Sequence, residues 1–114
     1  MGTKKSREDL LQGTLDMLVL KTLTAGQLHG YAIAQLIQQL SNDLLCVEEG
    51  SLYPALQRLE LNGWIEGNWG LSAHNRRARF YTLTPEGREH LEAETNRYRR
   101  QTGAIARIMG FAFE

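Results

Sequence analysis

The stretch EEGSLYPALQRLELNG, residues 48–63, is the one from which the rest of the sequence can be interpreted. Three leucines recur in it at helical spacing: Leu52, Leu56 and Leu59. Gly63 follows where a helix C-cap would stand, but Pro54 lies inside the pattern. Proline lacks an N–H and its ring collides with the preceding turn, so a helix tolerates it only near the start, where the first N–H groups have no partners. We therefore expect a helix that begins between Glu49 and Tyr53.

Two further helices are expected before this segment. Residues 8–25 carry a broad apolar face, which predicts a helix buried on both sides, with Ser6 as its N-cap and Gly26 as its stop signal. Residues 30–41 carry a narrower stripe, made of Ile33, Ile37 and Leu40. The polar residues after Leu40 end this second helix.

A β-hairpin is expected after the third helix. Residues 64–69 suit a short strand, residues 70–77 a turn-rich loop, and residues 78–84 a second strand. Thr84 and Pro85 then mark a helix start, because Thr is a good N-cap and Pro is tolerated at the first helical position. We expect this last helix to run to about Met109.

The apolar stripe of the last helix is thin. Its members repeat about every seven residues and continue toward the C-terminus: Leu91, Tyr98, Ile105, Ile108 and Met109. Such a stripe is typical of a helix that protrudes and pairs with a second chain, so it predicts a homodimer. The alternative is that the helix lies as a lid on its own chain.

Three helices followed by a β-hairpin is the order of a winged helix-turn-helix, a mainly α fold with a small β-hairpin. Residues 8–84 would form this DNA-binding domain and residues 85–114 a C-terminal dimerisation helix. In this fold the start of the third helix meets base edges and phosphates, and the hairpin, or wing, reaches the adjacent minor groove or backbone. The candidate DNA-binding residues are Gly50, Ser51, Tyr53, Pro54, Gln57 and Arg58 in the helix and Arg76, Arg77 and Arg79 in the wing.

Composition supports a single folded domain. The chain has 114 residues, of which 42% are hydrophobic and 23% charged. Net charge is zero, which by itself argues mildly against a nucleic-acid partner. The charges are unevenly distributed, however, because residues 67–85 and 95–113 contain no acid and several arginines. The overall balance therefore conceals local basic segments.

Several function classes are disfavoured. No apolar run is long enough to span a membrane, and no secretory signal follows the basic N-terminus. A single cysteine, Cys46, cannot form an internal disulfide, so we expect a cytoplasmic protein. The three histidines and Cys46 do not have metal-ligand spacing, and no phosphate-binding glycine loop or nucleophile motif is present. We therefore expect no enzyme, metal or cofactor.

Three blocks resemble the PadR-like transcriptional regulators: HGYAIAQLI (29–37), GSLYPALQRLELNGWI (50–65) and RRARFYTLTPEGRE (76–89). The resemblance extends over about residues 10–92 and implies a winged helix that binds palindromic operators. It implies that the C-terminal helix packs against the first helix of a partner, so Leu11 and Leu15 would join the dimer interface. It also implies repression, relieved in some members by small aromatic molecules. The tip HNRRAR departs from the family's usual glycine- or proline-containing wing.

Individual residues leave alternatives open. Tyr53 either contacts DNA or packs half-buried beside Leu52, and Arg58 either contacts DNA or pairs with an acid such as Glu60 or Glu66. The wing arginines contact phosphates or lie in a solvated loop. Trp64 and Trp69 line an effector pocket at the dimer interface, or Trp64 packs behind the third helix and Trp69 stays half exposed on its strand. Cys46 is expected to be a small buried residue, and His29 to cap a turn.

The sequence thus predicts a homodimeric winged-helix repressor that places two recognition helices in successive major grooves of a pseudo-palindromic operator. A winged helix used as a protein-interaction module is the alternative, and zero net charge is its best support. A sensor whose main task is to bind small molecules would need an apolar cavity between two subunits.

Overall fold

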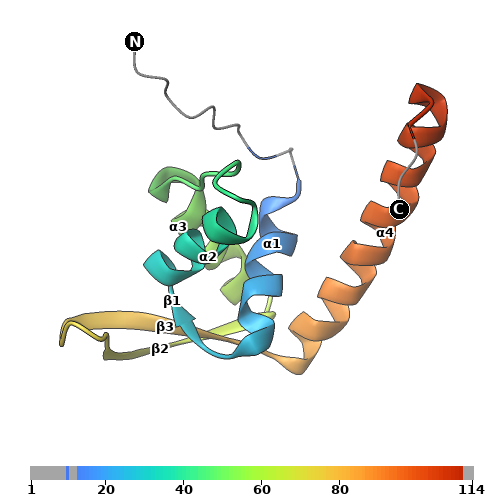
Figure 1. The fold of residues 1–114 in the computed structure, drawn as a ribbon. Coiled ribbons are helices and arrows are strands. Elements are labelled where there is room, and N and C mark those ends of the chain that lie inside the picture. Colours follow the sequence, from blue (N-terminus) through green and yellow to red (C-terminus); the bar gives the residue numbers. More distant parts are fainter. Residues whose placement is uncertain (1–9, 11–12, 112–114) are drawn as a thin grey trace, which may run out of the picture.

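The computed structural model describes residue 10 and residues 13–111. The elements are α1 (Leu15–Thr22), a 3-10 turn η1 (Leu23–Ala25), β1 (Leu28–His29), α2 (Gly30–Leu40), α3 (Glu49–Leu61), β2 (Ile65–Leu71), β3 (Arg77–Leu83) and α4 (Pro85–Met109). Figure 1 shows α1, α2 and α3 gathered together, with the hairpin of β2 and β3 extending to one side and α4 rising on the other. The predicted mainly helical fold with a small hairpin is confirmed.

The core lies where the three clustered helices meet the base of the sheet. Its most deeply buried side chains come from α1, η1, α2, α3 and β2: Val19, Leu20, Leu23, Ile33, Leu52, Leu56, Leu59 and Ile65. The three leucines that predicted the third helix are among them. Fully burying a leucine side chain stabilises a fold by about 1.5–3 kcal/mol, so this stripe anchors α3 against the other elements.

The third helix begins at Glu49, at the early edge of the predicted window. Pro54 therefore lies inside the helix, where it cannot donate a hydrogen bond to the carbonyl of Gly50. Both residues face solvent, which limits the cost of the missing bond. Gly63 adopts the left-handed conformation that terminates the helix (φ +77°), as its place in the sequence indicated.

The sheet has one more strand than the predicted hairpin. The two-residue strand β1 pairs antiparallel with β3, Leu28 opposite Tyr81 and His29 opposite Phe80, so the strand order is β1-β3-β2. The sequence prediction of a two-stranded hairpin was therefore incomplete. A strand of two residues is too short to show alternating hydrophobicity, so its pairing follows from where α1 and α2 place it.

The first helix is shorter than predicted. Gly13 has a left-handed backbone conformation (φ +85°), and α1 begins at Leu15, so a continuous helix over 8–25 was wrong. The candidate cap Ser6 lies outside the described residues. The wing strands also differ slightly, because β2 continues to Leu71 and β3 begins at Arg77, which leaves a tip loop of 72–76 instead of 70–77.

A single buried residue joins the wing to α4. The Thr84 hydroxyl accepts a hydrogen bond from the Gly87 amide (3.0 Å) and donates one to the Gly63 carbonyl (2.7 Å). The Thr84 amide donates to the carbonyl of Trp64 (3.1 Å). Thr84 is thus the predicted N-cap of α4 and also ties that helix to the turn after α3.

The first turns of α4 press against the start of β2. A Cβ atom added at Gly87 would lie 2.0 Å from the carbonyl oxygen of Trp64, so only glycine fits there. One turn later, His90 stacks on the Trp64 indole with 3.5 Å between ring centroids and an interplanar angle of 10°. These contacts set the direction in which α4 leaves the helix cluster (Figure 1).

We expect Gly87→Ala to lower the free energy of unfolding by about 2–4 kcal/mol, the range of severe overpacking in a rigid backbone contact. Urea unfolding at one fixed protein concentration measures this. Gly103→Ala is the matched control in the same helix, because its Cβ would meet only Arg107 Nη1 at 3.9 Å. Alanine is a better helix former than glycine by about 0.8–1.0 kcal/mol, so the control should be as stable as the parent or more stable. Equal stability of Gly87→Ala and the parent would contradict the close contact.

Candidate nucleic-acid interface

One face of α3 is buried and the opposite face is open. Leu52, Ala55, Leu56 and Leu59 point into the core. Its exposed residues include those the sequence singled out for DNA: Ser51, Tyr53, Pro54, Gln57 and Arg58. Glu49 and Leu61 of the same helix are exposed as well. A Cβ at Gly50 would meet no atom within 4 Å, so the backbone at the helix start is also open to solvent. The structure thus brings the predicted helix residues together on one surface.

Tyr53 packs on one side against α2 and is open to solvent on the other, and its contact with DNA stays a prediction. Its ring packs over Gly30 at the start of α2, where an added Cβ would come within 3.1 Å of Tyr53 Cε1. The side chain nevertheless remains 48% exposed. The contact restrains the ring between α2 and α3 without removing its edge from solvent.

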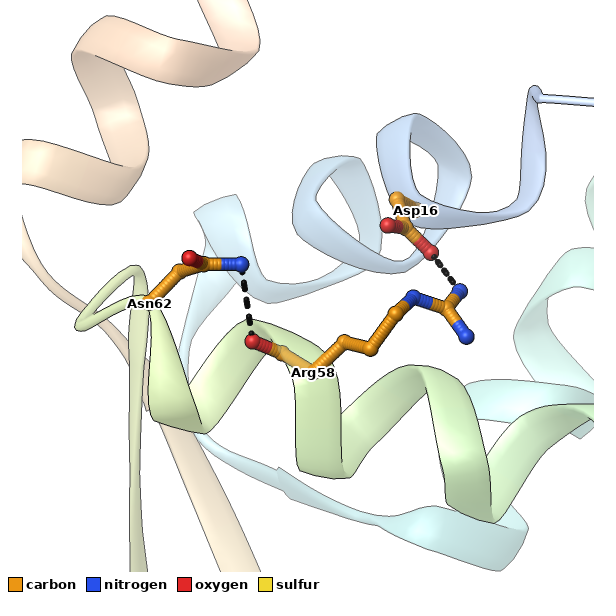
Figure 2. Close-up of polar contacts among 3 residues, drawn as sticks. All are labelled: Asp16, Arg58 and Asn62. Carbon is orange, nitrogen blue, oxygen red and sulfur yellow. Dashed lines mark hydrogen bonds and ion pairs between the residues drawn. The ribbon is translucent and has the colours of Figure 1, made fainter.

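Arg58 forms an ion pair with an acid that the sequence analysis did not consider. Its Nη2 lies 2.6 Å from Oδ1 of Asp16 in α1 (Figure 2). Glu60 pairs with Arg79 instead. Asn62 Nδ2 also donates to the Arg58 carbonyl (3.0 Å). Because the Arg58 side chain is 55% exposed, the pair contributes little to stability but directs the guanidinium toward α1.

The wing carries an aromatic side chain between arginines. In the β2–β3 register Trp69 lies opposite Arg79, and Leu71 lies opposite Arg77. The guanidinium carbon of Arg77 is 4.6 Å from the centroid of the Trp69 ring, and that of Arg79 is 5.7 Å away. Trp69 is 59% exposed, so it supports both arginines from a solvated surface.

The tip of the wing is closed by Ser72. Its amide donates to the Arg76 carbonyl (2.8 Å), and its carbonyl accepts from the Asn75 amide (2.9 Å). Asn75 is in the left-handed conformation (φ +62°), which asparagine tolerates well and which turns the chain without glycine. The unusual tip HNRRAR therefore still forms a tight loop that leaves Arg76 exposed.

Arg79 differs from the other two wing arginines. Its Nη2 donates a hydrogen bond to Oε2 of Glu60 on α3, in an ion pair that is about two-thirds shielded from solvent. The sequence reasoning treated the wing as free of acids because residues 67–85 contain none. Glu60 lies outside that window and is brought to Arg79 by the fold. No local sequence signal could have revealed this pair.

Tyr81 lies beneath this ion pair. Burial raises the pKa of its phenol above the usual value, against the opposing effect of the Arg79 charge, while Glu60 and Tyr53 raise it further. The phenol therefore stays neutral at physiological pH and keeps its proton as a hydrogen-bond donor. Tyr81 is buried, so it belongs to the support of the interface and not to its exposed surface.

An open groove of about 870 Å³ lies between the wing and the N-terminal turn of α2. Its lining includes Tyr53 and the three wing arginines, and none of the described residues that line it is acidic. Several polar residues of this lining were not predicted from the sequence, among them Tyr31, Gln35 and His74. Helical spacing places Tyr31 and Gln35 on one face of α2, but a polar helix face by itself does not indicate binding. The groove has the concave shape and basic lining that suit a phosphate backbone.

The N-terminus of α2 is capped by the side chain of the residue that precedes it. His29 Nδ1 accepts a hydrogen bond from the Ala32 amide (3.3 Å), which confirms the capping role predicted for this residue.

A second open groove, of about 590 Å³, runs between α2 and the start of α3, and its lining includes Glu48, Glu49 and the half-buried Cys46. The charge of the surface thus changes sign from one side of Tyr53 to the other.

The predicted dimer residues divide into two groups. Leu15 and Leu91 are partly buried against the chain's own core. Four others, in the C-terminal part of α4, are exposed: Tyr98, Ile105, Ile108 and Met109. Leu11 lies outside the described residues. Figure 1 shows this half of α4 standing away from the helix cluster, which is the arrangement expected of a protruding helix rather than a lid.

Over residue 10 and residues 13–111, no helix has the length and apolar character needed to cross a membrane. Within the same ranges, no group of three or more histidine, cysteine, aspartate or glutamate side chains is placed to hold a metal ion.

Two known proteins are similar in sequence to most of this chain. A protein of Lysinibacillus sphaericus named "Uncharacterized protein X" is 31% identical over 85 residues, which cover 75% of this chain and 78% of that protein. A 37.1 kDa protein of transposon TN4556 from Streptomyces fradiae is 43% identical over 98 residues. That match covers 86% of this chain but only 25% of the Streptomyces protein, so this chain spans about a quarter of that relative.

The fold is also similar to that of solved regulators. The structure of a transcriptional regulator from Clostridium thermocellum superposes with a TM-score of 0.77 at 29% sequence identity, covering 84% of this chain and 93% of that one. Residues 19–93, from α1 to the first turns of α4, match the family described as "Transcriptional regulator PadR-like family". These residues include the whole helix-turn-helix and wing, and the chain therefore belongs to the PadR-like family of transcriptional regulators.

Proposed function

We propose that this PadR-like regulator is a homodimeric repressor that binds a pseudo-palindromic operator in the cytoplasm. The observation that carries the proposal is the acid-free groove between the wing and α2, which adjoins the exposed face of α3. A groove of this kind lets an overall neutral protein present a locally positive surface to DNA. The alternative of a protein-interaction module rests on the neutral charge alone.

In this proposal α3 reads the major groove. Gly50 and Ser51 lie at its open N-terminal turn, where the positive end of the helix dipole favours a phosphate and offsets the neighbouring acids Glu48 and Glu49. Tyr53 and Gln57 present polar groups from the exposed face, on which Pro54 also lies. Arg58 would exchange part of its ion pair with Asp16 for contact with DNA.

The wing contacts the flanking backbone in the same proposal. Arg76 at the tip and Arg77 on the face of Trp69 are exposed and have the long, flexible reach that phosphate contacts require. Stacking on Trp69 restricts Arg77 while leaving its N–H groups able to donate. Such contacts release counterions, so affinity should fall as the salt concentration rises.

The exposed apolar residues of α4 would form the dimer interface. Ile108 is 83% exposed and is followed by Met109, with Ile105 one turn before. Exposed apolar side chains clustered on one helix mark a surface that another chain covers. We propose that the second chain contributes its own α4 and α1, and that this pairing fixes the distance between the two recognition helices.

We also propose that a small aromatic effector relieves repression. Trp64 is the better placed of the two candidate tryptophans, because its ring stacks on His90 at the base of α4. A ligand that disturbed this stack would change the direction of α4 and thereby the spacing of the two α3 helices. Trp69 lies on the wing beside Arg77, on the side we assign to DNA.

We expect the protein to bind duplex DNA from its own upstream region with strong salt dependence. The double variant Arg76→Ala with Arg77→Ala should have a shallower slope of log affinity against log salt. Its magnitude should fall by about one for each lost phosphate contact. Fluorescence anisotropy at several salt concentrations measures this. Arg88→Ala with Arg97→Ala, which removes two exposed charges from α4, should leave the slope nearly unchanged. Binding without salt dependence would favour the protein-interaction module.

Gln57→Ala should reduce discrimination between the operator and random duplex by about 1–3 kcal/mol, the value of one bidentate base contact. The salt slope should not change, because a neutral side chain releases no counterion. Competition anisotropy with the two duplexes measures the ratio. Equal loss of affinity for both duplexes would assign Gln57 to the DNA backbone instead of a base.

Ile108→Glu should convert the dimer to a monomer at micromolar concentration, because it places a charge in the proposed apolar interface. Sedimentation velocity measures the oligomeric state. Leu71→Glu is the matched control, since Leu71 is also exposed, at 65%, but lies on the wing. A monomeric parent protein, or a dimer that survives Ile108→Glu, would contradict the assigned interface.

A further inference from the structure

Arg79 is surrounded on three sides by groups that hold its guanidinium in place. Glu60 of α3 accepts a hydrogen bond from Nη2, and the Trp69 ring lies 5.7 Å from the guanidinium carbon. On β2, a Cβ added at Gly67 would come within 2.6 Å of Arg79 Nε and 2.8 Å of Nη2. The side chain is only 32% exposed. A flexible arginine with this many neighbours is restrained to one position.

The restraint connects two elements that must act together on DNA. Glu60 belongs to the C-terminal half of α3, whereas Trp69, Gly67 and Arg79 belong to the wing. The hairpin extends sideways from the helix cluster (Figure 1), so its angle to α3 depends on contacts near its base. Tyr81, buried under the same ion pair and paired with Leu28 of β1, extends these contacts into the core.

We propose that Arg79 is a positioning residue that braces the wing against the recognition helix, and that Arg77 is the wing-strand arginine that contacts DNA. The two side chains both approach the Trp69 ring but differ in their partners. Arg77 lies nearer the tip, on the centroid of Trp69, and is exposed. Arg79 lies nearer the base of the wing and forms an ion pair with Glu60. This inference rests on the proposed DNA-binding function only where it is tested by affinity for DNA.

The two possible roles of Arg79 predict opposite effects of Glu60→Gln on the affinity for DNA. If Arg79 contacted phosphate, Glu60 would compete with DNA for it and would repel the backbone, so Glu60→Gln would strengthen binding. If Arg79 braces the wing, Glu60→Gln releases the wing and weakens binding. The sign of one affinity change therefore separates the two roles.

The binding experiment compares Glu60→Gln, Arg79→Ala, the double variant and Arg77→Ala by anisotropy over a range of salt. We expect Glu60→Gln and Arg79→Ala each to weaken binding about two- to fivefold, as for loss of a partly exposed ion pair. The double variant should bind no more weakly than Arg79→Ala, because the two residues act as a unit. Their salt slopes should stay within half a unit of the parent, while Arg77→Ala lowers the slope by about one.

Gly67→Ala is a second variant that keeps both charges. Its methyl group would enter the space of the Arg79 guanidinium, which can move at little cost to overall stability. We expect it to weaken binding as Arg79→Ala does, with an unfolding midpoint close to that of the parent. Tighter binding by Glu60→Gln, together with a salt slope lowered by about one in Arg79→Ala, would overturn the proposal and make Arg79 a phosphate contact.

A measurement without DNA tests the brace on its own. Hydrogen–deuterium exchange of the amides of β2 and β3 should be faster in Glu60→Gln and Arg79→Ala than in the parent, with the amides of α1 unchanged. Arg77→Ala should exchange like the parent. Unchanged exchange in Glu60→Gln would overturn the brace whatever the affinities. A parent that binds no DNA selectively while the exchange results hold would instead contradict the proposed function.

Discussion

Burial of the leucine stripe of α3 is the constraint on which the other features depend. Leu52, Leu56 and Leu59 pack against α1 and α2, and they thereby set the rotation of α3 about its own axis. With that rotation fixed, the polar residues between the leucines can only face outward. The same packing brings Asp16 to Arg58 and Glu60 to Arg79, so the position of the charged side chains follows from the position of the apolar ones.

Local charge, rather than total charge, is what this fold organises. The chain is neutral, yet the described residues that line the groove beside the wing include three arginines and no acid. The acids Glu48 and Glu49 line a separate groove on the other side of Tyr53. Asp16 of α1 and Glu60 of α3 are paired with Arg58 and Arg79, which partly neutralises both acids. A neutral protein can in this way present a positive surface of limited extent.

The connection between wing and α4 has a mechanical consequence. Only Thr84 separates β3 from α4, and its side chain bonds both to the new helix and to the turn after α3. With no room for a side chain at Gly87, the start of α4 cannot shift relative to Trp64 without breaking these contacts. A change in the direction of α4 would therefore be transmitted to the wing and to the end of α3, which is the coupling that an effector of a dimer would need.

The helices, the hairpin and the exposed residues of α3 could be predicted from the sequence, because periodicity, capping residues and turn residues are local signals. Leu52 and its neighbours specified the buried face, and Thr84 and Pro85 specified the start of α4. Three features could not be predicted: the strand β1, the ion pairs of Arg58 and Arg79, and the stacking of Trp64 on His90. Each joins residues far apart in the chain, and such a contact exists only after the core has brought its two sides together. The sequence by itself determined the elements and their surfaces; the tertiary structure alone decided which arginines are held by acids and which remain open to solvent.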